Sequence, residues 1–353
     1  MVPRGVGPRG HEGGGFLMEI LVTGGNGFIG RHLVAALQGR GDSVRVLALP
    51  QEDATEMERS GVRVFRGDVR DSVSLVAPMR GVDGVLHLAA MMDVWRPLAD
   101  YRAVNVTGAE NVCRAALSAG VERLVHMSSS SVYGIGHGRP VDEDSPLRPF
   151  SDPYPISKAE GDFLVQRSIR EAGLPAVIIR PDQIFGPGDA LHFGAIADRL
   201  LAGTAVIVGS GRNRVPWVYV SDVVDGLLLA LDHPRAVGHA YNITNDQPLT
   251  QLELMNTIAA EVGAHPRLVH VPQAVLSAAG HGAELLARLT RSRRRPPVTR
   301  LGVAFIGTDT RHDISRARKE LGYAPRVPLR EGIRRAAAWH VSRRSARVQA
   351  HAV

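Results

Sequence analysis

Short apolar runs alternate with amphipathic stretches along the first half of the chain. Apolar strands are expected at residues 19–23, 43–47, 62–65, 84–90, 121–127 and 177–181, with helices at 28–37 and 108–119 between them. Strands that alternate with helices form a parallel sheet covered on both faces. The pattern therefore predicts an α/β fold with a doubly wound parallel sheet.

The pattern becomes less regular beyond residue 181. A turn-rich loop at 185–189 is followed by expected helices at 193–202 and 273–289 and expected strands at 205–208 and 217–220. We expect this part of the chain to form a smaller C-terminal α/β region that binds the substrate.

A glycine-rich turn, TGGNGFIG at residues 23–30, joins the first expected strand to the first expected helix. Gly24 permits a tight turn, Gly27 lets the backbone approach a diphosphate at the helix start, and Gly30 lets the helix pack closely on the sheet. The order of strand, turn and helix predicts a Rossmann-type dinucleotide site. Its predicted contacts also include Phe28 and Ile29.

Later strand ends complete the predicted cofactor site. Asp68 follows the strand at 62–65 and is placed to accept from an adenine amino group, although a plain loop aspartate is equally compatible with its position. The strand at 84–90 ends in small residues beside which a cofactor can pass. The remaining predicted cofactor contacts are Val69, Leu88, Ala89, Ala90 and Pro181.

The second strand ends in Ala48 and Leu49, where an NAD-selective fold usually carries an acid for the ribose 2′-hydroxyl. Loss of that acid removes a repulsion against a 2′-phosphate, and Arg31 and Arg45 are nearby cations. The cofactor is therefore NAD or NADP, with NADP slightly favoured. Both arginines are equally compatible with solvated surface charges.

Tyr154 and Lys158 have the spacing of a proton-transfer pair. A phenol titrates at about pH 10 when unperturbed, and a cation one helical turn away favours its phenolate form. Positions i and i+4 share one face of a helix, so the two side chains can meet. Together with the glycine turn, the pair predicts an enzyme that transfers hydride.

These motifs resemble the extended short-chain dehydrogenases/reductases, within the NAD-dependent epimerase/dehydratase superfamily, from residue 18 to about residue 339. The resemblance implies that Ser129, Tyr154 and Lys158 are catalytic, with Tyr154 as the acid/base. It also implies that Asn105 braces the serine loop. Tyr154 and Lys158 would contact the cofactor as well, and no metal is expected.

The substrate is the open question. Nucleotide-sugar enzymes of this family usually carry a diphosphate-binding arginine where this chain has Val215, and Arg214 is one residue away, facing the opposite side of an extended strand. Residues 241–245, 296–300 and 317–323 instead resemble the 3β-hydroxysteroid dehydrogenase branch and related β-keto acid reductases. The expected substrate is therefore a hydrophobic secondary alcohol or ketone.

Predicted substrate contacts are Met92, Trp95, Ser130 and Phe185. The helix at 273–289 either supplies an apolar wall for the substrate or packs on its own domain. A nucleotide-sugar epimerase remains the alternative. A dehydratase is disfavoured because Ser130 and Ser131 stand where it would carry two acids. A redox sensor without turnover is disfavoured because Tyr154 and Lys158 are both present.

Composition fits an enzyme of this kind. The chain has 353 residues, one cysteine (Cys113) and no apolar run of the length a membrane helix needs, so we expect a cytoplasmic protein without an integral membrane segment. The net charge of +7 is concentrated in arginines at 291–295 and 343–347, which argues against a nucleic-acid-binding face. The arginines at 291–295 form either a solvated loop or an attraction for an acidic substrate group.

The expected organisation has four parts. Residues 1–17 form a flexible extension, 18–180 the NAD(P)-binding domain, 181–340 mainly the substrate-binding region with some elements returning to the first domain, and 341–353 a basic tail. Family members commonly pair through the helix that carries the tyrosine and lysine and the helix before it. The resemblance therefore implies a homodimer through residues 153–172 and 100–119.

Overall fold

The computed structural model describes residues 17–92, 94–292 and 294–351. Its main sheet has seven strands in the order β10-β6-β5-β4-β1-β2-β3, and all neighbouring strands are parallel. The strands are β1 (Glu19–Thr23), β2 (Ser43–Ala48), β3 (Arg63–Arg66), β4 (Gly84–His87), β5 (Arg123–Met127), β6 (Ala176–Pro181) and β10 (Ala240–Ile243). The order reverses between β1 and β4, and a ligand crevice is expected at this point.

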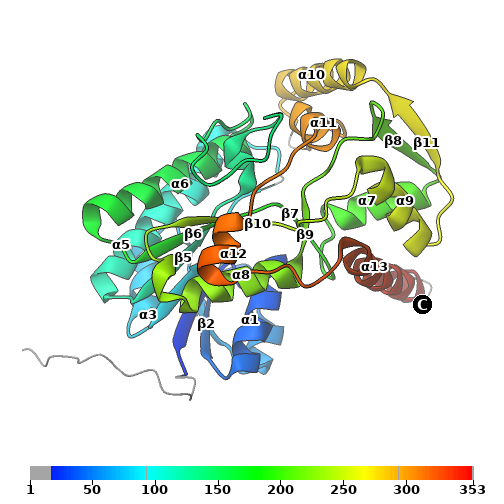
Figure 1. Ribbon diagram of the computed structural model, residues 1–353. Helices are drawn as coiled ribbons and strands as arrows, with labels where there is room; N and C mark the ends of the chain where they lie inside the picture. The colour runs from blue at the N-terminus through cyan, green and yellow to red at the C-terminus, as the bar shows by residue number, and fades with distance from the viewer. Residues whose placement is uncertain (1–16, 93, 293, 352–353) are drawn as a thin grey trace, which may run out of the picture.

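Alternation of side chains along the central strand builds two cores. Ile20 and Val22 face the helices α1 (Phe28–Arg40) and α8 (Val220–Asp232), whereas Leu21 faces the opposite layer. That layer contains α3 (Val76–Met79), α5 (Ala109–Ala119) and α6 (Pro153–Ala172). Figure 1 shows α5 and α6 on one side of the sheet and α1 and α8 on the other. The doubly wound Rossmann-type fold predicted from the sequence is confirmed.

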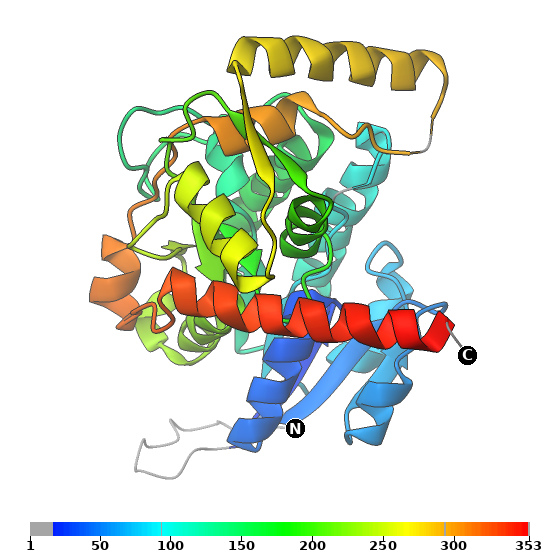
Figure 2. The same ribbon diagram turned by 90° about the vertical axis from the view of Figure 1, so that its right-hand side faces the viewer.

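The smaller region lies beside the carboxyl ends of the main strands (Figures 1 and 2). Two short parallel pairs form here, β7 (Gln183–Phe185) with β9 (Trp217–Tyr219) and β8 (Thr204–Val208) with β11 (Arg267–Val271). Helices α7 (Phe193–Leu201), α9 (Gln251–Glu261), α10 (Gln273–Leu289), α11 (Arg300–Gly307) and α13 (Leu329–His351) complete it. Its own apolar core includes Phe185, Phe193 and Trp217.

The remaining elements are short. They are α2 (Thr55–Arg59), α4 (Leu98–Arg102), α12 (Ser315–Leu321), three 3-10 segments (Ser72–Leu75, Ser130–Tyr133 and Pro234–Ala236) and a π-helical segment (Ala103–Gly108). After the first strands of the smaller region, the chain returns to the main sheet through α8 and β10. The division at residue 180 remains a prediction.

Several expected boundaries move. The strand expected at 84–90 ends at His87, and Leu88 and Ala89 beyond it lie against Gly24. The expected extension 1–17 lies outside the described residues except for Leu17. The basic segment expected from 341 begins within α13 rather than after it. Within the described residues, no helix combines the length and the apolar character needed to cross a membrane.

Candidate active site

The glycine turn brings the start of α1 against the end of β4. Gly24 has φ +71°, and a Cβ there would lie 2.8 Å from the Ala89 nitrogen. At Gly30 a Cβ would lie 2.2 Å from the Gly24 oxygen, so α1 can approach the turn only without a side chain. Gly27 precedes α1, whose first turn contains no acidic residue. Its free amides fit a diphosphate.

A cavity of about 820 Å³ opens from this turn along the carboxyl ends of the strands. Its volume and its glycine-lined floor fit a dinucleotide with room for a substrate. It brings together most of the residues predicted from the sequence. They are Gly24, Gly27, Phe28, Ile29, Gly30, Asp68, Val69, Leu88, Ala89, Ala90, Met92, Ser129, Ser130, Tyr154, Lys158 and Pro181.

The tyrosine and the lysine occupy the first turns of α6. The Asp152 carboxylate accepts from the Tyr154 backbone N–H at 3.2 Å and so caps the helix. Lys158 is buried, and its ammonium donates to the carbonyl oxygen of Met127 at 2.7 Å. Burial lowers the pKa of Lys158 to about 8, and the nearby Asp162 carboxylate opposes this shift. The lysine therefore stays largely cationic at neutral pH.

Two buried histidines lie on the strands behind this lysine. The rings of His87 and His126 are 5.3 Å apart, and His87 Nδ1 is 2.7 Å from the Thr23 hydroxyl. Burial, with the Lys158 charge adding to it, lowers the pKa of His87 to about 3 and the pKa of His126 far below its usual range. Both imidazoles are therefore neutral and leave Lys158 as the local cation.

Four consecutive serines, residues 128–131, follow β5, and their hydrogen bonds distinguish them. Ser128 donates to the Asp162 carboxylate at 2.6 Å, so its hydroxyl is held inside the fold. Ser129 Oγ accepts from the Ser131 N–H at 3.2 Å, and its residue is half-buried at the cavity wall. This hydroxyl retains its own proton for a substrate oxygen. Ser130 is buried but also borders the cavity.

A buried ion pair between Arg180 and Asp162 supports the serine loop that follows β5. Arg180 donates to both oxygens of Asp162, at 2.8 and 2.9 Å, and also to the Tyr133 hydroxyl at 2.8 Å. Arg180 holds the pKa of Asp162 below its usual value against the opposing effect of burial. Asp162 therefore remains a carboxylate that holds the Ser128 hydroxyl, next to Ser129 in the chain.

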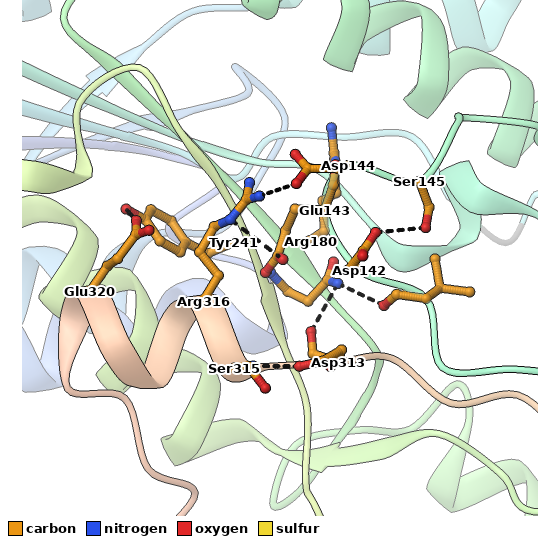
Figure 3. Close-up of polar contacts among 12 residues, drawn as sticks. Asp142, Glu143, Asp144, Ser145, Arg180, Tyr241, Asp313, Ser315, Arg316 and Glu320 are labelled. Carbon is orange, nitrogen blue, oxygen red and sulfur yellow. Dashed lines mark hydrogen bonds and ion pairs between the residues drawn. The ribbon is translucent and has the colours of Figure 1, made fainter.

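A second polar cluster continues from Arg180 to the surface (Figure 3). Arg180 also donates to the carbonyl oxygen of Glu143 at 3.2 Å, and the Glu143 carboxylate accepts from the Asn242 N–H at 2.8 Å. Arg316 of α12 binds Asp144 at 2.5 Å, beside Glu143. These contacts tie α12 and β10 to the segment that follows the serine loop, so they support the site without lining it.

Asn105 braces a different loop from the one expected. Its amide accepts from the Met91 N–H at 2.8 Å and donates to the Met91 carbonyl at 3.0 Å, and it also donates to the Ser157 hydroxyl at 2.9 Å. It therefore holds the loop after β4 against α6, not the serine loop. Asn105 lies in a π-helical turn that packs closely on α6. A Cβ at Gly161 would lie 2.4 Å from the backbone carbonyl oxygen of Asn105.

Two of the predicted substrate residues lie off the main cavity. Phe185 is fully buried, 5.0 Å from the Trp217 ring, and belongs to the core of the smaller region. Its role as a substrate contact is corrected accordingly. Trp95 lines a small adjoining hollow that also contacts Tyr154. Met92 does reach the cavity, and its side chain is partly exposed.

The substrate end contains apolar residues that sequence reasoning did not single out, namely Leu191, Leu301 and Phe305. Arg295, from the arginine cluster noted in the sequence at 291–295, borders the cavity there as well. Asp182 also borders the cavity and is 2.7 Å from the buried His312 imidazole. No spacing signal joins these residues, because they come from three segments that meet only in the folded chain.

The end of the cavity beside Leu49 and Asp68, where the adenosine of the cofactor is expected, contains different charged residues from those predicted. We call it the adenosine end. Arg31 binds Glu56 at 2.7 Å. Arg45, on β2, binds Glu19 at the amino end of the neighbouring strand β1. Neither arginine borders the cavity. Glu52 does border it, with its carboxylate accepting from the Leu49 N–H at 3.2 Å. The two arginines behind the slight sequence-based preference for NADP therefore do not border the cavity, and the charged groups that border it at this end are Glu52, Asp68 and Arg70. The missed signal is an acid three residues past Leu49.

Asp68 is held by Arg70. The guanidinium lies 2.6 Å from the Asp68 carboxylate, and this hydrogen bond lowers the pKa of Asp68. Both residues border the adenosine end of the cavity. The carboxylate keeps lone pairs for an adenine amino group, so its predicted contact with the cofactor remains a prediction.

Comparison with known proteins decides the family. The profile described as "NAD dependent epimerase/dehydratase family" matches residues 20–244, which include the glycine turn, the serine loop and the Tyr154–Lys158 pair. The chain belongs to this family. It is accordingly an NAD(P)-binding oxidoreductase of the extended short-chain dehydrogenase/reductase type.

Curated relatives include both reductases and dehydrogenases. The chain is 36% identical over 330 residues to a 2-alkyl-3-oxoalkanoate reductase of Stenotrophomonas maltophilia, covering 90% of this chain and 98% of the relative. It is 32% identical over 321 residues to a 4-hydroxy-2-methyl-3-oxo-4-farnesyl-3,4-dihydroquinoline-1-oxide ketoreductase of Stigmatella aurantiaca, covering 90% and 95%. A 3-beta-hydroxysteroid dehydrogenase of Mycolicibacterium neoaurum is 30% identical, covering 88% and 87%. These relatives match the branch that the sequence resembles.

Solved structures of the family share the fold. The dTDP-glucose 4,6-dehydratase DesIV of Streptomyces venezuelae, solved with NAD and TYD bound, superposes with a TM-score of 0.76 at 28% identity, covering 93% of this chain and 98% of that chain. The family therefore includes nucleotide-sugar enzymes as well as reductases. The choice between these activities depends on this chain's own site.

Proposed function

We propose that this protein interconverts a secondary alcohol and a ketone on a hydrophobic substrate, sterol-like or a β-hydroxy/β-keto acid. The observation that carries the proposal is one cavity that holds Tyr154, Lys158 and Ser129 and continues between apolar side chains. Met92, Leu191, Leu301 and Phe305 form that apolar part. A ketone held there would have its oxygen near the phenol and its apolar body against these side chains.

In the proposed reaction Tyr154 gives a proton to the ketone oxygen during reduction and takes it from the alcohol during oxidation. Lys158 favours the phenolate that this exchange requires, since its ammonium is fixed by Met127 and shielded from solvent. Ser129 orients the substrate oxygen. The nicotinamide, when bound, supplies or accepts the hydride. Gly24, Gly27 and the start of α1 would hold its diphosphate.

A nucleotide-sugar epimerase is supported less well. Val215, which stands where such enzymes carry an arginine, is buried in the core of the smaller region. Arg214 lies outside the cavity lining, beside Asp309 and paired in a bridge with Thr250. A sugar nucleotide would bring a diphosphate to the apolar part of the cavity. Among the described residues, Arg295 is the one arginine that borders this part.

We also propose that NAD is used in preference to NADP. The support is the Glu52 carboxylate at the adenosine end, since a carboxylate accepts from a ribose 2′-hydroxyl and repels a 2′-phosphate. Arg70 is the cation at this end, and Asp68 offsets its charge. NADP would need a compensating cation there.

A homodimer through α5 and α6 is proposed from the family resemblance. The apolar side chains Leu117 on α5 and Phe163 on α6 are 37% and 50% exposed, which is consistent with a covered face. Light scattering on the purified protein tests it. A mass of two chains that falls to one in Phe163→Glu supports this interface, and a monomer in the unchanged protein contradicts it.

The functional proposal is tested with the purified protein, each nicotinamide cofactor and a panel of hydroxysteroids, β-keto acids and nucleotide sugars. We expect net oxidation or reduction of the cofactor with the lipid-like substrates and none with the sugars. Conversion of a nucleotide sugar to its epimer without net change in the cofactor would overturn the proposal in favour of an isomerase.

A further inference from the structure

The outer face of α10 is apolar and uncovered. Val275, Leu285, Leu286 and Leu289 point outward from this helix and are between 57% and 73% exposed. Positions 278, 279 and 282 of the same stripe are alanine or glycine, also exposed. Figures 1 and 2 show α10 at the edge of the molecule, above α11. The stripe therefore offers a continuous apolar surface that the rest of the described chain does not bury.

The inner face fixes this orientation. Gly280, Glu284 and Ala287 are buried against the segment that begins α11. The Glu284 carboxylate accepts from the Arg300 N–H at 2.8 Å and from Arg300 Nε at 2.9 Å. Turning the helix to bury its leucines would expose Ala287 and leave a carboxylate without its cation, so the outward apolar face is a property of the folded protein.

The charge next to this face is positive. Arg288, Arg291, Arg294 and Arg295 are exposed at the carboxyl end of α10 and just beyond it. Between residues 262 and 300 the sequence contains one acid, Glu284, and that acid is buried. An apolar helical stripe beside a cluster of arginines fits an anionic lipid surface, where the leucines enter the acyl boundary and the arginines meet the headgroups.

A second copy of the chain fits this face less well. A two-fold interface pairs the same patch of both copies, so each arginine cluster would need acids on the facing patch. Residues 262–300 offer none that is exposed. Charge complementarity therefore favours a lipid surface over self-association through α10.

The same segment leads to the cavity. Arg295, Leu301 and Phe305 follow α10 in the chain and line the substrate end, where Leu191 is 62% exposed. We propose that the outer face of α10 docks this enzyme on an anionic membrane surface as an interfacial helix. Entry of a lipid-like substrate from that surface would rest on the proposed function, whereas docking itself does not.

Flotation of the full-length protein with lipid vesicles tests the docking. We expect binding to vesicles of phosphatidylcholine with phosphatidylglycerol, weaker binding to phosphatidylcholine alone, and a decrease as salt is raised. Leu285→Gln/Leu289→Gln should reduce the bound fraction about tenfold, since two inserted side chains are lost. Arg291→Gln/Arg294→Gln should reduce binding to the vesicles that contain phosphatidylglycerol and leave binding to pure phosphatidylcholine vesicles unchanged. Glutamine is a good helix former, so the two leucine positions within α10 keep their helix propensity.

The matched control is Val73→Gln/Val76→Gln, which changes two similarly exposed apolar side chains elsewhere on the surface. We expect it to bind vesicles as the unchanged protein does. Absence of the unchanged protein from the floating fraction, or equal losses in the control and the leucine variant, would overturn the proposal. A leucine variant that converts a dimer to a monomer, with no vesicle binding by the unchanged protein, would assign the face to self-association instead.

Discussion

The Lys158 ammonium donates to the carbonyl oxygen of Met127, 2.7 Å away, and the lysine is buried at the cavity wall. The hydrogen bond fixes the cation one helical turn from Tyr154. It also places a charged group in a poorly solvated site, at a cost in stability that depends on pH.

The first prediction concerns this dependence. The folded pKa of Lys158 is about 8 because of burial, whereas a lysine in an unfolded chain titrates at about 10.4. Between these values the unfolded chain binds a proton that the folded protein does not, so this group makes the free energy of unfolding rise with pH. The slope approaches about 1.4 kcal/mol per pH unit. Below about pH 8 the group contributes no slope.

Lys158→Met removes that contribution. Urea unfolding of both cofactor-free proteins from neutral pH to pH 10 should show the unchanged protein gaining stability relative to the variant above about pH 8. The difference between the two proteins isolates this lysine from other groups that titrate there. A difference that is constant with pH would contradict the lowered pKa.

The second prediction concerns the ion pair behind the serines. Asp162→Asn leaves the buried Arg180 without its counter-charge and should lower the free energy of unfolding by about 3 to 5 kcal/mol. Chemical denaturation measures it. Glu160→Gln, on the same helix, breaks an exposed pair with Arg102 and should change stability little. Equal effects of the two changes would show that Asp162 is not the anchor.

The third prediction separates two glycines of α1. A Cβ at Gly30 would lie 2.2 Å from a backbone oxygen of the turn, whereas one at Gly39 would meet nothing within 4 Å. Gly30→Ala should therefore weaken cofactor binding at least about tenfold, as calorimetric titration would measure, because the diphosphate turn must shift. Gly39→Ala should bind normally and gain up to about 1 kcal/mol in stability. Normal binding by both variants would refute the role given to the turn.

Asn105 gives the fourth prediction. Asn105→Ala removes three hydrogen bonds that hold Met91 and Ser157, so it should cost about 2 to 3 kcal/mol in stability. It should also raise the KM of cofactor and substrate more than it lowers kcat, because the loop after β4 borders the cavity. A pure loss of kcat with unchanged KM would instead favour the serine-loop role that the sequence suggested.

The sequence predicted the local features well. The glycine turn, the strands and the Tyr154–Lys158 pair follow from periodicity and spacing within a few residues, and they agree with the fold. Helix 273–289 was also predicted over its observed range. Such features depend on short-range geometry, which a single chain displays directly.

Features that depend on distant segments were not predictable in the same way. Arg45 was expected near the cofactor, but the strand carries it to Glu19, at the far end of the sheet. Phe185 was expected at the substrate, but its neighbours in the core come from residues about 8 and 32 positions later. Glu52 enters the cavity through a loop whose path no hydrophobic pattern records.

Glu52 carries the fifth prediction. Replacing this residue by glutamine removes the negative charge but keeps a hydrogen-bond acceptor, so NADP should improve relative to NAD by about tenfold in kcat/KM. Steady-state kinetics with both cofactors measures it. An unchanged protein that already prefers NADP would contradict the assignment of NAD.

The central claim is that Tyr154 transfers the proton while nicotinamide, bound in the cavity, exchanges hydride with a lipid-like substrate. The most direct test follows the near-ultraviolet absorbance of reduced nicotinamide with hydroxysteroids and β-keto acids, in the unchanged protein and in Tyr154→Phe, with cofactor binding measured in parallel. We predict turnover by the unchanged protein and a loss of about a thousandfold or more in the variant, with cofactor affinity retained. Full activity in Tyr154→Phe would contradict the account.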